Sequence, residues 1–466
     1  MSLDVLVLVG YALGMLALGW LGMRRSRNQE DFLVAGRNLG PGMYMSTMAA
    51  TVLGGASTIG SVRLGYVHGL SGLWLCTTIG LGIVILNLFL AKPLLNLRIF
   101  TVTQALERRY NPVTRRVSAL IMFAYALMIG VVSTLGISTV MQVFLHLPFA
   151  LAVLLSGGLV VAYSTVGGMW ALTLTDMVQF IIKTIGMILL LLPISLHRVG
   201  GWDELMARLP SSAFSLTTIG YDTIITYVLI YTFGVLIGQD IWQRVFTARN
   251  PTVARYAGTV AGVYCVLYGT ATALIGMCAK VLLPHLDNVN NAFAAIIQVA
   301  LPEGIRSLVI TAAMAAMMST ASAGLLAASS TLSEDLLPVV RGGRPSGLSI
   351  TRICALCTGV LVLATALAVS DVLSALTLAY NLLVGGMLIP LLGAIFWKRA
   401  TPAAAMTSMI LGCATATAFM LKDGIDANTP IYYSLAAGLA SFVAVSVLSQ
   451  QPAAVAANAA RAENPF

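Results

Sequence analysis

The feature that most constrains this chain is a long hydrophobic segment with a polar break in its middle. Residues 43–70 are long enough to cross a membrane, but residues 54–60 read GGASTIG. Glycine costs a helix interior about 1 kcal/mol relative to alanine, and unpaired backbone groups are costly in lipid. Such a break is tolerated where freed carbonyl groups line a polar cavity, which is where transporters hold ions and substrates. The segment therefore predicts a binding site at mid-membrane.

The composition indicates a polytopic membrane protein. Hydrophobic residues make up 58% of the chain and charged residues 9%, and the mean hydropathy is +0.91, whereas soluble domains carry about 25% charged residues. The net charge of +9 does not indicate a nucleic-acid partner, because the basic residues lie in short connections between apolar segments. The six cysteines are scattered, so we expect buried thiols and not a metal site.

Apolar segments of suitable length predict about thirteen spans. Lys and Arg cluster in alternate connections, after the first, third, seventh, ninth and eleventh spans. Cytoplasmic connections carry such an excess, so we expect the N-terminus outside and the C-terminus in the cytoplasm of a bacterial inner membrane. The predicted spans are 4–23, 43–70, 72–97, 117–145, 148–166, 173–196, 220–244, 253–283, 305–335, 349–369, 371–395, 402–421 and 430–449.

Glycine interrupts a second segment, residues 231–240, which read YTFGVLIGQD. The two broken segments begin two groups of five spans, and an odd offset gives the groups opposite orientations. This pattern predicts an all-α transmembrane fold with a LeuT-like 5+5 inverted repeat, one extra N-terminal helix and two extra C-terminal helices. Alternatively, both segments are packing kinks. The predicted parts are 1–41 (helix and loop), 42–198 (first repeat), 219–397 (second repeat), 398–449 (C-terminal helices) and 450–466 (cytoplasmic tail).

Two adjacent hydroxyls, Ser319 and Thr320, stand in an otherwise apolar ninth span. A sodium ion prefers about five or six oxygen ligands from carbonyls, hydroxyls or carboxylates. The hydroxyls are therefore candidate ligands. The alternative is that they donate to carbonyls of the preceding helical turn, as Ser and Thr commonly do in apolar helices.

Three motifs, in order along the chain, resemble the sodium/solute symporter family. They are DFLVAGRNLG at 31–40, GGMWALTLTDMVQ at 167–179 and WKRATP at 397–402. The resemblance implies a primary sodium site between the second and ninth spans. Its ligands would be the backbone carbonyls of Ala56, Ile59 and Ala316 and the hydroxyls of Ser319 and Thr320.

The resemblance also bears on a second ion. Some members bind a second sodium with further serines of the ninth span and an aspartate of the sixth, and Asp176 and Ser322 match these positions. Ala323 stands where such members have another serine, which favours one sodium per solute. Asp176 could instead cap the N-terminus of its helix.

Several residues are candidates for binding the solute. Arg63 is a charge inside a span, and such charges are functional candidates by default. A guanidinium there suits a carboxylate or amino-acid-like solute, although Arg63 could also snorkel to the interface. Trp74 matches a pocket tryptophan of the choline carriers in the family, or it anchors the chain at the interface. The remaining candidates for the cavity wall are Thr58, Tyr231, Tyr380 and Asn381.

Lys183 lies in the middle of the sixth span, seven residues after Asp176 and on the same helical face. A buried lysine loses its proton readily, so it could replace a coupling ion by carrying a proton. The alternative is a lysine that is held in a salt bridge or snorkels to the interface. Asp240 and Arg244 are four residues apart, and we expect them to pair with each other.

Together these features predict a sodium-coupled secondary active symporter that imports a small organic solute across the lipid bilayer by alternating access. No nucleophile–base pair or metal cluster stands in the spans, so we do not expect an enzyme. The alternatives are a proton-coupled transporter that uses Lys183, and a solute sensor with a separate signalling partner. The oligomeric state is undetermined, and a monomer is compatible with this plan.

Overall fold

The structure, a computed structural model, describes residues 3–344, 346–369 and 372–449. The predicted tail 450–466 lies outside the described residues. Within the described ranges the regular elements are helices, and an isolated parallel bridge joins Leu39 to Ala248. The predicted all-α architecture is confirmed.

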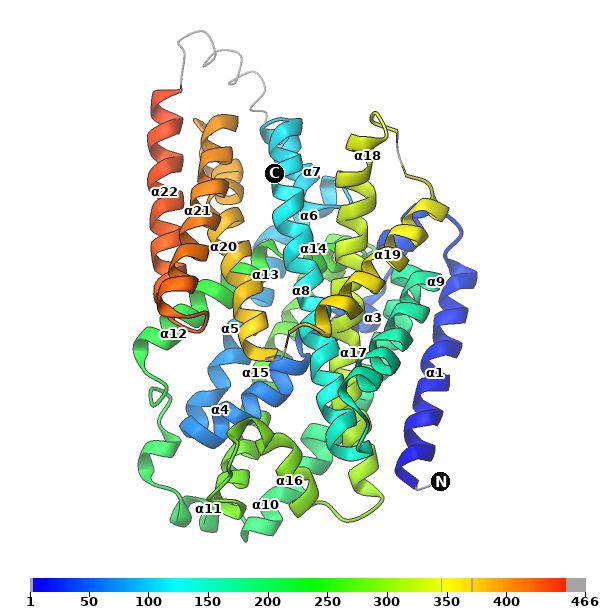
Figure 1. The fold of residues 1–466 in the computed structure, drawn as a ribbon, viewed down its shortest axis with the longest axis vertical. Helices are drawn as coiled ribbons and strands as arrows, with labels where there is room; N and C mark the ends of the chain where they lie inside the picture. Colours follow the sequence, from blue (N-terminus) through cyan, green and yellow to red (C-terminus); the bar gives the residue numbers. More distant parts are fainter. Residues whose placement is uncertain (1–2, 345, 370–371, 450–466) are drawn as a thin grey trace.

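The longer helices and the elements at the two breaks form the body of the molecule (Figure 1). They are α1 (Leu3–Arg25), α3 (Pro41–Val52), η2 (Ala56–Gly60), α4 (Ser61–His68), α5 (Trp74–Ile85), α8 (Pro112–Leu145), α9 (Phe149–Lys183), η5 (Thr184–Leu191), η7 (Val228–Thr232), α13 (Phe233–Ile237), α14 (Gln239–Val245), α15 (Pro251–Leu282), α17 (Ile305–Thr331), η9 (Leu332–Leu336), α19 (Leu348–Ala366), α20 (Val372–Phe396), α21 (Pro402–Asp423) and α22 (Thr429–Leu448). The shorter connecting elements are α2 (Gln29–Val34), η1 (Ala35–Arg37), η3 (Gly69–Leu73), η4 (Leu86–Leu90), α6 (Ala91–Asn96), α7 (Val102–Arg109), α10 (Leu192–Val199), α11 (Trp202–Arg208), η6 (Ser211–Phe214), α12 (Tyr221–Tyr227), η8 (Val289–Asn291), α16 (Ala292–Ala300) and α18 (Leu337–Val340).

Asparagine–proline pairs start two of the long helices. The side chain of Asn111 accepts the backbone N–H of Thr114 at 2.8 Å at the start of α8. The side chain of Asn250 does the same for Val253 at 2.8 Å at the start of α15. Each asparagine satisfies an N–H that has no partner within the helix, and the following proline loses nothing at the first helical position.

The described residues contain ten helices that are long and apolar enough to cross a membrane, or up to eleven if the bent pair at Gly238 is one span. The expected thirteen are not reached by this count. One reason is that the run Ala56–Asn96, 41 residues long, counts once although it covers parts of the predicted spans 43–70 and 72–97. The other is that the apolar run Phe149–Val199 holds 51 residues, while about 20 suffice for one crossing.

Glycine bends that long run. Gly168 in α9 has φ 57° and ψ −148°, a conformation that glycine adopts without a steric penalty. A Cβ at this position would lie 2.5 Å from the carbonyl oxygen of Phe32. The predicted spans 148–166 and 173–196 therefore lie on either side of Gly168, where two helices meet at a kink.

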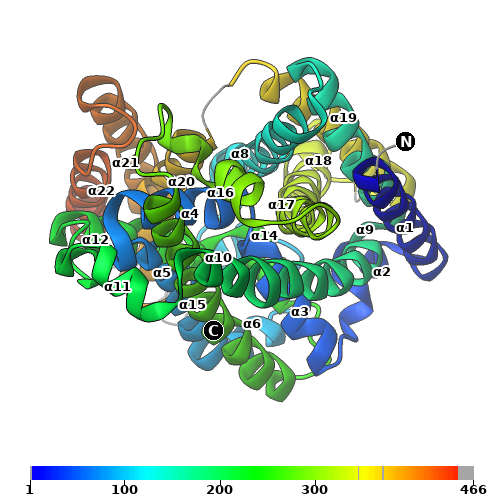
Figure 2. The same cartoon turned by 90° about the horizontal axis from the view of Figure 1, so that it is seen from below.

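The helices are arranged around α17. Figure 2 shows α17 near the middle of the bundle, and it packs against α8, α9 and α19. Almost all of its side chains are buried, whereas α1, α21 and α22 lie at the periphery. Large apolar side chains such as Leu6, Leu120 and Leu421 are exposed on the outer helices. Such an exterior is what a lipid-facing surface requires.

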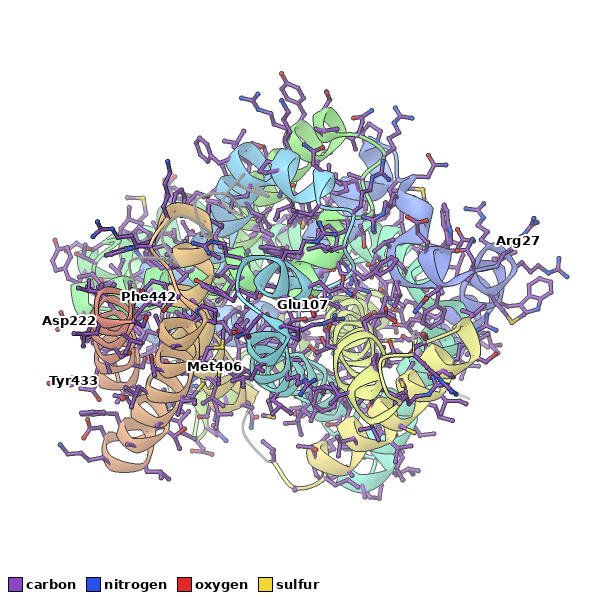
Figure 3. The ribbon with its side chains drawn as sticks, turned by 90° about the horizontal axis from the view of Figure 1, so that it is seen from above. Arg27, Glu107, Asp222, Met406, Tyr433 and Phe442 are labelled. Carbon is purple, nitrogen blue, oxygen red and sulfur yellow. The ribbon has the colours of Figure 1, made fainter. Side chains whose placement is uncertain are left out.

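The two ends of the bundle differ. Figure 1 shows α7 and α18 at one end, and α10, α11 and α16 at the other. Figure 3 looks onto the first end and shows Glu107 of α7 near its middle, with Arg27 at the margin. There Arg115 joins three elements, because Nη1 lies 2.6 Å from Glu107 and Nε lies 2.9 Å from Asp335. These ion pairs tie α7, α8 and η9 together.

Candidate functional site

The first helix break lies between α3 and η2. α3 ends at Val52, Leu53 has non-helical dihedrals (φ −97°, ψ 66°), and the helix resumes in η2. Glycine is needed because α17 approaches closely: a Cβ on Gly54 would lie 2.5 Å from Oγ1 of Thr320. The predicted interruption of residues 43–70 is therefore present, and it begins directly before the glycine pair.

The break exposes the carbonyl groups of the last turn of α3. A helix leaves its last four C=O groups without partners in the helix. Here side chains from other elements donate hydrogen bonds to these carbonyl groups. From α17, Ser319 Oγ donates to Ala50 O at 2.8 Å and Thr320 Oγ1 donates to Thr51 O at 2.6 Å. Ser57 Oγ donates to Val52 O at 2.9 Å, and Lys183 Nζ donates to Ala49 O at 3.3 Å and to Ala50 O at 3.5 Å. We call the carbonyls of residues 49–51 with the hydroxyls of Ser319 and Thr320 the α3–α17 cluster.

The predicted sodium ligands are only partly brought together. Ser319 also donates to the carbonyl of Ala316 at 2.9 Å, so these two residues and Thr320 share one face of α17. The carbonyl of Ala56 instead accepts the N–H of Ser61 inside the helical ladder. Ile59 is half-buried in η2, and no hydrogen bond joins it to α17 among the described residues. The carbonyls that face the hydroxyls of α17 lie about six residues earlier, in the turn before Gly54.

A small cavity adjoins the cluster at the break. Its volume is about 30 Å³, which is the room that one water molecule takes. Thr51 and Thr320 line it, so the cavity and the cluster share a wall. The full lining is Thr51, Val52, Gly54, Gly55, Ala56, Ser57, Ile79, Ile129, Val132, Ser133, Asp240, Thr320, Leu376 and Tyr380.

The second break brings Asp240 to the same cavity. The helix bends by 49° between α13 and α14, and Gly238 is extended there (φ −66°, ψ 132°). Trp242 Nε1 donates to the carbonyl of Leu236 at 2.7 Å and so satisfies one group freed by the bend. Asp240 Oδ1 accepts the hydroxyl of Tyr125 at 3.1 Å. Both glycine-rich segments are thus true helix breaks, and both reach the cavity.

Three of the six predicted solute residues lie in the lining of this cavity or directly beside a lining residue. Tyr380 is part of its lining. The ring of Tyr231 packs edge-on against Tyr380, with 5.4 Å between ring centroids. Asn381, the next residue, is buried, and its amide has no hydrogen-bond partner among the described residues.

Three other predicted solute residues lie outside the lining. The hydroxyl of Thr58 is paired with that of Tyr268 at 2.8 Å. Trp74 Nε1 donates to the carbonyl of Leu216 at 2.7 Å, in the loop before α12. Arg63 is half-buried in α4. Because Arg63 does not reach the cavity, the physical reason for expecting a carboxylate solute is removed, and the charged side chain in the lining is Asp240.

Four buried ionisable side chains surround the break. Asp176 accepts the hydroxyl of Thr47 at 2.5 Å and lies 3.6 Å from Nη2 of Arg244. The expected ion pair between Asp240 and Arg244 is therefore replaced by a pair between Arg244 and Asp176. Asp176 lies eight residues beyond the bend at Gly168, too far to cap the helix that starts there. Ser322 donates to the carbonyl of Ser319 at 3.0 Å, within its own helix.

The sequence did not predict that Asp240 lines the cavity, nor that the carbonyls of Ala50 and Thr51 accept the hydroxyls of α17. Ala56 and Ile59 follow from the family resemblance, whereas the carbonyls that meet α17 in the structure are those of Ala50 and Thr51. The signal that separates the two is the position of the glycine pair, because only carbonyls that precede a break lose their helical partners.

Comparison with known proteins identifies the chain. The family model for the sodium:solute symporter family matches residues 32–412. The high-affinity proline transporter PutP of Bacillus subtilis (strain 168) is 25% identical over 461 residues, covering 94% of this chain and 96% of that protein. The sodium/pantothenate symporter of Escherichia coli (strain K12) is 26% identical over 445 residues, covering 88% and 89%.

A solved structure shares the fold. The substrate-bound, outward-open structure of a Na+-coupled sialic acid symporter superposes with a TM-score of 0.84 at 18% identity, covering 96% of this chain and 98% of that one. The family match and the shared fold each extend over most of the chain, including both helix breaks and the cavity between them. This chain belongs to the sodium:solute symporter family.

Proposed function

We propose that this protein is a secondary active symporter that carries a small organic solute across a membrane by alternating access. The observation that carries the proposal is that two broken helices from different parts of the chain line one cavity. Backbone groups freed at such breaks are how transporters of this kind hold ions and solutes. The two five-span repeats, 42–198 and 219–397, would rock against each other around this point.

The cavity favours an amino-acid-like solute. Its lining is mostly apolar, with the hydroxyls of Ser57, Ser133 and Thr320 and the carboxylate of Asp240. A solute amine would face Asp240, and the apolar wall would contact the solute's side chain. The volume of about 30 Å³ is too small for such a solute, so binding requires the elements around the break to move apart.

The driving force would be the gradient of a cation. A cation held between α3 and α17 would tie the two helices together and complete the adjoining wall of the cavity. Coupling then arises because the cation and the solute bind the same conformation better than its alternative. Sodium is the first ion to test, because the family is one of sodium:solute symporters. A proton on Lys183 is the second, because Nζ lies at the same carbonyls.

The distribution of Lys and Arg suggests how the chain would be oriented in the membrane. The connections rich in Lys and Arg would face the cytoplasm, with the N-terminus outside. The ion pairs of Arg115 would then close the cytoplasmic end, and α10, α11 and α16 would cover the outer end.

Uptake into proteoliposomes tests the function. Purified protein would be supplied with radiolabelled amino acids and related solutes under an imposed sodium gradient, a pH gradient, or neither. We expect concentrative uptake of at least one solute under one gradient. Ala56→Leu, which fills the cavity wall, should lower that uptake at least tenfold, whereas Ala162→Leu on the exposed face of α9 should leave it unchanged. Equal loss in both variants, or equilibration without concentration under every gradient, would contradict the proposal.

A further inference from the structure

Lys183 places a positive charge at the helix break. Its side chain is fully buried at the end of α9. Nζ donates to the carbonyls of Ala49 and Ala50 at 3.3 and 3.5 Å and lies 5.9 Å from the ring centroid of Tyr268. None of the ion pairs among the described residues includes Lys183. The ammonium is therefore held by backbone oxygens and an aromatic face, which is how a protein holds a small monovalent cation.

The position is one that attracts a cation. The two carbonyls belong to the last turn of α3, where the helix dipole places partial negative charge. The carbonyl of Ala50 accepts hydrogen bonds from both Lys183 and Ser319. The ammonium and the hydroxyl of Ser319 thus share the Ala50 carbonyl oxygen, at the contact where a cation between α3 and α17 would lie.

We propose that the ammonium of Lys183 is the resident cation of the α3–α17 cluster and takes the place of a sodium ion there. Binding of the solute in the adjoining cavity then needs no sodium at this position. This inference rests on the proposed function in taking the cavity as the solute site, whereas the position of Lys183 comes from its contacts alone. It predicts that loss of the lysine creates a demand for a dissolved cation.

Charge balance supports the proposal. The buried groups around the break are the carboxylates of Asp176 and Asp240 and the cations of Lys183 and Arg244, two of each sign. The other titratable groups near Lys183 are the thiols of Cys76 and Cys265 and the phenol of Tyr268, which are neutral when protonated. A sodium ion beside the ammonium would add an unbalanced charge. At about 4 Å the repulsion would weaken sodium binding by at least about a hundredfold.

The decisive variant is Lys183→Met, which keeps an unbranched chain and removes the charge. The midpoint of thermal unfolding would be measured for the purified full chain in NaCl and in KCl at equal ionic strength. We expect equal midpoints for the native protein. Lys183→Met should gain a sodium-specific rise of roughly 2–4 °C, because a ligand stabilises the state that binds it.

Three controls accompany this measurement. Lys183→Arg keeps the charge and should remain indifferent to sodium. Lys280→Met removes a lysine in the last turn of α15, whose Nζ donates to the carbonyl of Pro284. The unfolding midpoint of this variant should also be the same in NaCl and in KCl. The double variant Lys183→Met with Ser319→Ala should lose the gained sodium response.

The proposal is overturned if the native protein shows a sodium-specific rise that Ser319→Ala abolishes, because sodium then binds the cluster beside the lysine. It is also overturned if folded Lys183→Met shows no sodium response. If Lys183→Met does not fold, the native protein, Lys183→Arg and Ser319→Ala decide, and equal midpoints in both salts for all three support the proposal. Failure of the proposed function shows itself separately, as absence of concentrative uptake by the native protein.

Discussion

At the scale of single residues, the site depends on close approach of backbones. Gly54 lies where α3 ends and Thr320 of α17 comes nearest to it. The hydroxyl of Thr320 reaches the carbonyl of Thr51 at 2.6 Å only because no side chain stands between them. One missing Cβ therefore allows both the hydrogen bond and the shared wall of the cavity.

Gly54→Ala should destabilise the protein by about 1–3 kcal/mol, because the added methyl would overlap Thr320 and push α17 away from α3. The free energy of unfolding in detergent, followed by circular dichroism, would measure this. Gly158→Ala is the matched control, since a Cβ at that helical position meets nothing within 4 Å. A change at Gly54 no larger than that at Gly158 would mean that the close approach is not needed.

At the scale of elements, ion pairs join helices at one end of the bundle, away from the helix breaks at its centre. Arg115 of α8 holds Asp335 of η9, whose carboxylate also accepts the hydroxyl of Thr101 at 3.0 Å. Asp335 is buried, while the Arg115 side chain is 22% exposed. Because α17 continues into η9, this contact fixes the far end of the helix that carries Ser319 and Thr320.

Arg115→Met should cost about 1–3 kcal/mol of stability, because it leaves the buried Asp335 without its cation. It should also make this end of the bundle more accessible to proteases. Arg208→Met removes an exposed pair with Glu204, and such pairs contribute about 0–1 kcal/mol. Thermal unfolding and limited proteolysis of the two variants would be compared, and equal behaviour would refute a gating role for Arg115.

At the scale of the whole molecule, the cavity is lined by parts of the chain that are far apart in sequence. Residues of the first break, α5, α8, α14, α17 and α20 all contribute to its lining. Transport by alternating access requires that this lining become accessible to water from each side in turn.

Ser133→Cys tests this movement. Ser133 lines the cavity, and its hydroxyl has no hydrogen-bond partner among the described residues, so the exchange should cost little. In a variant that lacks the six native cysteines, a membrane-impermeant thiol reagent should label this position, and transported solute should change the rate at least twofold. Ser156→Cys, buried in α9 away from the cavity, should stay unlabelled with or without solute. Labelling of Ser133→Cys that ignores every solute would contradict alternating access.

The sequence by itself determined the class of the protein and the location of its site along the chain. The hydropathy, the basic connections, the two glycine-rich breaks and the hydroxyls at Ser319 and Thr320 are properties of local stretches. Local stretches decide whether a segment enters lipid and where a helix must stop. These features predicted an all-helical transporter, and together with the family resemblance they predicted a site between the second and ninth spans.

Only the tertiary structure decided which groups meet. The choice of the Ala50 carbonyl over that of Ala56 depends on how α17 is seated against the last turn of α3. The pairing of Arg244 with Asp176, and not with Asp240, depends on how α14 and α9 both pack against α3. The placement of Lys183 at the α3 carbonyls depends on the same packing. Spacing along one helix cannot specify such contacts, because they join residues on different helices whose distances are set by how whole helices pack.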